Sequence, residues 1–154
     1  MLPSAPNREL NNDQVINMLL GHAYGRLACT DGHQPYIVPV TYAYDGEYIY
    51  GQTNDGFKLN VLRKNPNVCL QVDQVTDMRN WKSVVVYGTF EELKGNEAET
   101  ARKTFLNSVF PLMTNYAVHP FQHEVTSEID DSMRIKYVMY RIRIERISSR
   151  FEKQ

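Results

Sequence analysis

The sequence predicts a mainly β protein with α+β decoration: a six-stranded antiparallel barrel with about three helices, in one domain of 154 residues. Two Asp-Gly dipeptides, at 31–32 and 45–46, separate runs rich in β-branched and aromatic residues, as hairpin turns do. The later part of the chain holds one helical pattern and then a final alternating run. A chain of this length is long enough to bury a full core.

The first half of the chain is expected to form a tail, a helix and a three-stranded meander. Residues 1–11 are polar and contain proline, which predicts an N-terminal tail. Asn12 is the expected cap of a short helix over 13–20, in which apolar residues recur at helical spacing. The two Asp-Gly turns then join three strands, expected over 26–30, 36–44 and 47–52.

The second half is expected to contain two helices and three more strands. A short helix should end before Asn65-Pro66, and a longer one should begin at Asn96 and end at Pro111. Residues 76–82 and 111–134 lack a clean period and are predicted to be loops. The strands are expected over 67–75, 83–93 and 137–147, with the second of them central in the sheet because it is apolar on both sides.

Composition excludes several classes of function. The chain has 17 basic and 18 acidic residues and a net charge of −1, which argues against a nucleic-acid-binding protein. Because there is no apolar run of ~20 residues and no secretory leader pattern, we expect a soluble cytoplasmic protein without a membrane partner. Cys29 and Cys69 lie in separate apolar runs and are expected to be reduced thiols rather than a disulfide or a nucleophile.

The most informative segment runs from the end of a predicted strand into a predicted helix, over 50–59. Gln52 and Thr53 end the strand, Gly56 allows close approach of the backbone, and Lys58 lies in the first helical turn. Free backbone N–H groups, a hydroxyl and an ammonium group are the donors that bind a phosphate. An ordinary strand-to-helix turn with a solvated lysine remains the alternative.

A second unusual segment is the apolar strand that contains Pro39. Proline removes one hydrogen bond of the ladder, so this strand is predicted to lie at an edge of the sheet. The backbone amides beside Pro39, over 37–41, can then bond a planar heterocycle such as an isoalloxazine. The alternative is a plain edge strand without a ligand.

Five segments together resemble the pyridoxamine 5′-phosphate oxidase-like, FMN-binding split-barrel superfamily, and within it the nitroimidazole-resistance-type flavoproteins. The resemblance covers roughly residues 12 to 152 and depends on the order and spacing of the segments. They are Gly25-Arg26-Leu27-Ala28 followed by Pro35-Tyr36-Ile37-Val38-Pro39-Val40, Gly56-Phe57-Lys58-Leu59 followed by Arg63-Lys64-Asn65-Pro66, Trp81-Lys82-Ser83-Val84, Tyr140-Arg141-Ile142-Arg143-Ile144, and Ser149-Arg150-Phe151-Glu152.

The resemblance implies an FMN site at a homodimer interface. It places the isoalloxazine along the strand that contains Pro39 and the phosphate at Thr53 and Lys58. It places the ribityl chain near Phe57 and Leu59. The full set of expected cofactor-binding residues is Ile37, Val38, Pro39, Val40, Thr41, Gln52, Thr53, Gly56, Phe57, Lys58, Leu59, Trp81 and Ser83, with the last two contributed by either subunit.

The chain departs from the superfamily pattern at the phosphate turn. The family branch usually has two basic residues where this chain has Phe57 and Lys58, so one phosphate-binding cation is missing. The branch also commonly has a histidine before this turn, where this chain has Gly51 and Gln52.

The function predicted from these features is flavin-dependent reduction of a small organic acceptor, such as a nitroaromatic or nitroimidazole compound. The partners are a small-molecule substrate or an electron donor, and the catalytic residues are unknown. A non-catalytic flavin-binding or storage protein and a haem-handling protein of the same barrel class are the alternatives. His119 and His123 are four residues apart but lack the further ligands of a metal site, so no metal is expected.

Overall fold

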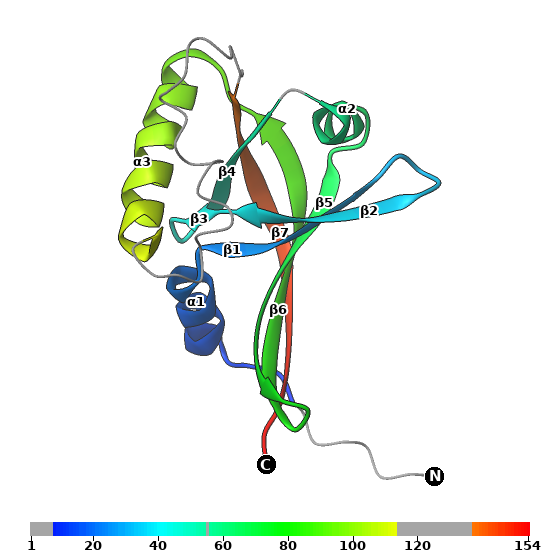
Figure 1. The fold of residues 1–154 in the computed structure, drawn as a ribbon, viewed down its shortest axis with the longest axis vertical. Coiled ribbons are helices and arrows are strands. Elements are labelled where there is room, and N and C mark those ends of the chain that lie inside the picture. The colour runs from blue at the N-terminus through cyan, green and yellow to red at the C-terminus, as the bar shows by residue number, and fades with distance from the viewer. Residues whose placement is uncertain (1–7, 55, 114–136) are drawn as a thin grey trace.

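The computed structural model describes residues 8–54, 56–113 and 137–154 and has one antiparallel sheet with helices around it (Figure 1). The elements follow one another along the chain as α1 (Asn12–Gly21), β1 (Tyr24–Thr30), β2 (Pro35–Thr41), β3 (Ala43–Tyr44), β4 (Tyr48–Asn54), α2 (Phe57–Lys64), β5 (Asn67–Asp77), β6 (Asn80–Glu92), α3 (Gly95–Met113) and β7 (Tyr137–Glu152). The predicted antiparallel, mainly β fold is confirmed, with seven strands among the described residues instead of six.

The additional strand arises at Tyr42, where the predicted strand over 36–44 turns a corner. The sheet has the order β2-β1-β5-β6-β7-β4-β3, so β2 and β3 lie at its two edges although one residue separates them in sequence. The backbone N–H of Tyr42 donates to the carbonyl of Ala23, and its buried hydroxyl donates to the carbonyl of Leu19 at 2.7 Å. The predicted meander is therefore two hairpins, β1–β2 and β3–β4, that meet at this corner.

Two apolar clusters stabilise the fold. The main cluster lies inside the curved sheet and includes residues of α1, α2 and the central strands; its fully buried members include Leu19, Leu27, Leu59, Leu62, Leu70, Val84 and Val86. A second cluster lies beneath α3, where Phe105 and Val109 pack on Ala43 and Met139. β6 is the central strand of the sheet, as predicted, but its half-buried Val85 and Tyr87 show that one face stays partly open in a single chain.

Several boundaries differ from the predictions. The helix cap is Asn11, whose side chain forms a capping box with Gln14, because that pair has the spacing that Asn12 lacks. The predicted loop over 76–82 is a tight hairpin, in which Asp77 Oδ1 accepts from the backbone N–H of Arg79 and β5 and β6 extend on either side. β7 continues to Glu152, five residues beyond its predicted end.

Three further predictions concern the segments next to the undescribed residues: the N-terminal tail, the end of α3 and the loop after it. Part of the predicted tail, from Arg8 to Asn11, lies along β7, since Arg8 accepts from the N–H of Phe151 and Leu10 donates to Ser149 Oγ. α3 contains Pro111 and continues to Met113 instead of ending at the proline. Residues 1–7 and most of the predicted loop over 111–134 lie outside the described residues. No helix in the described part of the chain is long and apolar enough to cross a bilayer.

Gly88 lies at the irregularity of β6 where its register with β7 shifts. A Cβ atom at this position would overlap the carbonyl oxygen of Arg143 and lie 2.7 Å from Ile142 Cγ2. Because backbone cannot rotate away as a side chain can, Gly88→Ala should lower the free energy of unfolding by about 1–3 kcal/mol. Chemical denaturation monitored by circular dichroism measures the change.

The matched control is Gly21→Ala, since no atom lies within 4 Å of a Cβ at that position and it ends α1. This control should be neutral or slightly stabilising, because alanine is the better helix former. Equal stability of the Gly88→Ala variant and the natural protein would contradict the close approach of β6 and β7.

Candidate functional site

The first turn of α2 is held at the surface by the residues that follow it. Leu59 and Leu62 are fully buried in the main core, and Val61 is 6% exposed. Helical geometry then leaves Phe57 and Lys58 outside the core, directly after the end of β4. Gly56 at the N-cap supplies no side-chain hydrogen bond, so within the described residues no N-cap side chain bonds the backbone N–H groups of the first turn. This arrangement suits an anion at the helix N-terminus.

A cavity of about 260 Å³ lies at this helix start. It contains five of the residues predicted from the sequence, namely Gln52, Thr53, Gly56, Phe57 and Lys58. Gln52 and Thr53 are almost completely buried, and Thr53 Oγ1 donates to the carbonyl of Asn54 at 3.4 Å. The structure therefore places a hydroxyl, an ammonium group and a helix N-terminus at one cavity, as the sequence predicts.

Three further residues line this cavity that the sequence analysis did not identify: Tyr36, Asn54 and Tyr137. Asn54 pairs with Tyr137 in the β4–β7 ladder, which joins residues more than 80 positions apart. The pairing of Asn54 with Tyr137 follows from the order of the strands in the sheet and has no local signal in the sequence. Tyr36 could have been found from sequence, because it lies two positions before Val38 and so shares a face with it in an extended strand.

The positive charge of Lys58 also affects the pKa of the Cys29 thiol, which lies on strand β1. Burial raises the pKa of Cys29, and the positive charge of Lys58 only partly opposes this effect. Burial likewise raises the pKa of Cys69. Both cysteines are free thiols, as predicted, although Cys69 is only half-buried. A raised pKa favours the neutral thiol, so neither cysteine has the environment of an activated nucleophile.

β2 is an edge strand, as Pro39 predicts. It pairs with β1, where Pro39 lies opposite Arg26, and its other side has no strand partner among the described residues. Ile37 and Pro39 are exposed, and Val38 is half-buried. This side of β2 therefore offers backbone groups at the surface near the cavity, which Tyr36 of the same strand lines.

Other predicted site residues lie in the interior. The side chains of Val40 and Leu59 belong to the main core, with exposed fractions of 1% and 0%. Thr41 is 3% exposed, and its Oγ1 has no hydrogen-bond partner among the described residues. For Val40 and Leu59, only the backbone remains for contact with a ligand.

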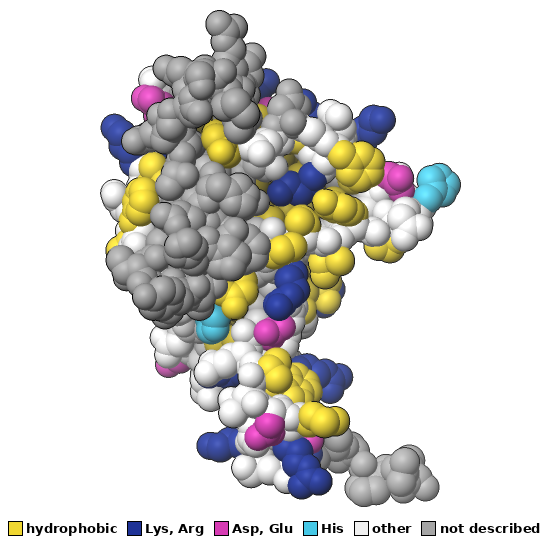
Figure 2. All heavy atoms as spheres, in the orientation of Figure 1, with side chains coloured by type: hydrophobic (Ala, Val, Ile, Leu, Met, Phe, Trp, Pro, Cys, Tyr) yellow, Lys and Arg dark blue, Asp and Glu magenta, His cyan; other side chains and the backbone are white. Residues whose placement is uncertain are grey.

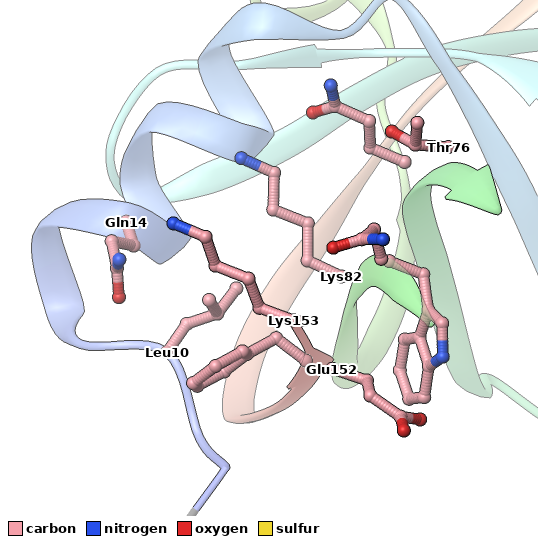
Figure 3. A pocket seen from close by; sticks show the side chains of 10 residues that line it. Leu10, Gln14, Thr76, Lys82, Glu152 and Lys153 are labelled. Atoms are coloured by element: carbon pink, nitrogen blue, oxygen red, sulfur yellow. The ribbon is translucent and has the colours of Figure 1, made fainter. Parts of the chain in front are cut away.

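Trp81 and Ser83 are not near this cavity in the same chain. Trp81 lines a second cavity of about 340 Å³ near the β5–β6 hairpin, at the other end of the sheet from α2 (Figures 1 and 3). Lys82 and Lys153 line the same cavity, and their side chains extend in the same direction in Figure 3. Ser83 Oγ accepts from Gln71 Nε2 at 3.1 Å. One chain alone thus does not unite all the predicted cofactor-binding residues.

The histidines do not gather at either cavity in the described part of the chain. His22 Nδ1 lies 2.8 Å from the carbonyl of Met18, and His33 is exposed between β1 and β2. His119 and His123 lie outside the described residues. Within the described ranges, no three His, Cys, Asp or Glu side chains come together as metal ligands would.

Comparison with known proteins places this geometry in a family. An uncharacterized protein of Rhizobium meliloti (strain 1021) is 38% identical over 90 residues, which is 58% of this chain and 60% of that relative. The crystal structure of a FAD-binding protein from Mesorhizobium loti is 30% identical, with a TM-score of 0.72 over 96% of this chain and 97% of that one.

A second solved structure shows the same fold at lower identity. It is a putative 5-nitroimidazole antibiotic resistance protein from Bacteroides thetaiotaomicron, 15% identical, with a TM-score of 0.65 over 93% of this chain and 86% of that one. The sequence also matches the family described as pyridoxamine 5'-phosphate oxidase over residues 11–151. The split-barrel fold and this match show that the chain belongs to the pyridoxamine 5'-phosphate oxidase family.

Proposed function

We propose that the protein binds the FMN unit of a flavin, with its phosphate at the start of α2. The observation that carries this proposal is the cavity in which Lys58, Thr53 and the first turn of α2 lie together. A phosphate monoester near neutral pH carries close to two negative charges and needs such donors when it is half-buried. Membership of the family and the similarity to a FAD-binding protein support a flavin as the ligand.

The size of the cavity indicates how a flavin would lie. About 260 Å³ is below the ~300–1,000 Å³ of ordinary ligand pockets, so this cavity suits the phosphate end alone. The isoalloxazine would then extend along the open side of β2, where the backbone near Pro39 has donors and acceptors without a neighbouring strand. FMN is the smallest flavin that satisfies both parts of this site.

The bound flavin would supply the redox chemistry, and the chain would supply position and charge. We propose an oxidoreductase that reduces a small organic acceptor, such as a nitroaromatic compound. A flavin-binding or storage protein without turnover is the second candidate. Steady consumption of a reduced nicotinamide in the presence of FMN and an acceptor would support the enzyme, and its absence would favour storage.

We further propose a homodimer in which Trp81 and Ser83 reach the flavin of the partner subunit. Two features of the single chain support it. Trp81 belongs to the start of β6, at the end of the sheet away from α2 (Figure 1), and it does not line the α2 cavity. The outer face of the central strands stays half-exposed at Val85 and Tyr87. A second copy would cover that face and complete the site. The family resemblance implies the same assembly.

Lys58→Ala should weaken the binding of FMN by about one to two decades, because a charge-assisted hydrogen bond contributes roughly 1.5–3 kcal/mol. Thr53→Ala should cost less, about 1 kcal/mol for a neutral hydrogen bond. Quenching of flavin fluorescence measures both. Riboflavin lacks the phosphate and is the control ligand, whose affinity should hardly change. Equal losses for FMN and riboflavin would show that the lysine supports the fold instead of the phosphate.

The shared site predicts complementation between two defective variants. Lys58→Ala and Trp81→Ala should each bind FMN weakly as homodimers. After the two are mixed and allowed to exchange subunits, about a quarter of all sites should bind FMN with natural affinity, because each mixed dimer of a two-fold assembly combines one intact Lys58 with one intact Trp81.

Light scattering provides the control for assembly, since both variants must remain dimers. A site contained within one chain would gain nothing from mixing. A monomer with tightly bound FMN would also overturn the shared site.

A further inference from the structure

A row of three side chains crosses the sheet near the β5–β6 hairpin. In the strand pairing, Lys82 of β6 lies opposite Gln74 of β5 on one side and Phe151 of β7 on the other. Lys82 is two positions before the fully buried Val84, and side chains two positions apart in a strand share a face. The row therefore continues the face of the sheet that carries the main core, and all three residues line the cavity of about 340 Å³ described above.

Two lysines lie on this part of the core face. Lys153 comes two positions after Phe151, just beyond the end of β7, so it is the diagonal neighbour of Lys82, at a backbone spacing of roughly 7–8 Å. Within residues 8–54, 56–113 and 137–154, neither ammonium group forms an ion pair. Both side chains extend toward the side of the cavity on which Gln14 lies (Figure 3). Two like charges at this spacing repel each other, and an anion between them removes that repulsion.

The acidic residue of the cavity lining does not neutralise these lysines. Glu152 alternates with Phe151 and Lys153 along the chain, so an extended backbone directs its side chain to the opposite face. Its carboxylate points away from the lysine ends in Figure 3. It pairs instead with Arg8, at 3.5 Å. The core-face part of the cavity therefore presents positive charge.

The rest of the lining supplies an amide donor and apolar surface. Gln14 Oε1 accepts from the backbone N–H of Asn11 in the capping box, which leaves Nε2 of this residue as a donor. Phe151, Trp81 and Leu10 contribute aromatic and aliphatic surface. Figure 2 shows hydrophobic and basic side chains next to one another toward this end of the molecule. The volume of about 340 Å³ is at the lower end of the ~300–1,000 Å³ of ligand pockets, so the ligand is small.

We propose that this cavity binds a small aromatic carboxylate, with the ring against Phe151 and the carboxylate between Lys82 and Lys153. Ammonium groups form charge-assisted hydrogen bonds with a carboxylate, and aromatic side chains favour an aromatic body. A carboxylate fits better than a phosphate, because the helix start beside the cavity is already capped: the backbone N–H of Gln14 donates to Asn11 Oδ1.

This site is separate from the proposed flavin site. The two cavities share no lining residue, and Lys58 belongs to the other one. Ser83, which follows Lys82, faces the opposite side of the sheet by the alternation of the strand. Trp81 is the lining residue that the proposed contact with the partner's flavin also uses. The inference therefore adds a second ligand and does not depend on the flavin.

Titration with benzoate tests the proposal, because Trp81 is the only tryptophan of the chain and its fluorescence reports on this cavity. We expect a saturable change in fluorescence, with the affinity checked by calorimetry. Benzamide has nearly the same shape without the charge and should bind at least about tenfold more weakly. Inorganic phosphate has the charge without the ring and should also bind more weakly than benzoate.

Lys153→Ala should weaken benzoate binding about fivefold, and its exposure beyond the end of β7 makes a folding defect unlikely to interfere. Lys82→Ala should weaken it about tenfold or more, since Lys82 is half-buried. The matched control is Lys103→Ala, which removes the same charge from an exposed position on α3. It should leave the affinity for benzoate within about twofold.

Several outcomes would overturn the inference: no binding of benzoate, equal affinities for benzoate and benzamide, phosphate binding as tight as benzoate binding, or equal losses in Lys153→Ala and Lys103→Ala. Competition between benzoate and FMN would also overturn it, because the cavity would then belong to the flavin site. Benzoate binding should persist in Lys58→Ala. FMN binding without benzoate binding would contradict this inference alone, and benzoate binding without FMN binding would contradict the proposed function alone.

Discussion

The burial of two leucines in α2 is the constraint on which the candidate site depends. Leu59 and Leu62 are completely buried, and each such side chain stabilises the fold by roughly 1.5–3 kcal/mol relative to an exposed one. Their positions on the helix determine which way its first turn faces. Phe57 and Lys58 therefore stay outside the core beside the end of β4, where both line the α2 cavity.

The corner at Tyr42 determines what lies opposite that helix. The hydroxyl of Tyr42 donates to Leu19 at the end of α1, and the chain on either side runs to opposite edges of the sheet. β2 is therefore an edge strand that turns its exposed residues, Ile37 and Pro39, to solvent near α2. An edge normally risks pairing with another chain, and the proline at its centre reduces that risk. A flavin along this edge would use the same open backbone groups.

Local sequence patterns predicted much of the fold. The Asp-Gly turns gave the hairpins, the alternation of Tyr140, Arg141 and Ile142 gave the last strand, and Gly56 with Lys58 gave the turn from β4 into α2. The corner at Tyr42 was missed because tertiary contacts, with Ala23 and Leu19, decide it.

The parts of the site that could not be predicted depend on distant pairing. Tyr137 reaches the cavity because β4 pairs with β7, and no local signal indicates that partner. The polar segment over 76–82 also misled the prediction, since an exposed hairpin has the composition of a loop. Trp81 was placed near the cofactor by family resemblance alone, and one chain does not bring it there.

The central claim is that Lys58 and the start of α2 hold the phosphate of a flavin. Phosphorus NMR of FMN bound to the protein tests it directly. A free phosphate monoester takes up its second proton near pH 6, whereas a phosphate bound to an ammonium group and helix N–H groups favours the doubly charged form. As the pH is lowered, we expect the phosphorus chemical shift of bound FMN to stay at the value of the dianion until at least ~1 pH unit below the pH at which free FMN titrates. A bound FMN whose phosphate titrates like the free compound would contradict the claim, because its phosphate would then lie in solvent.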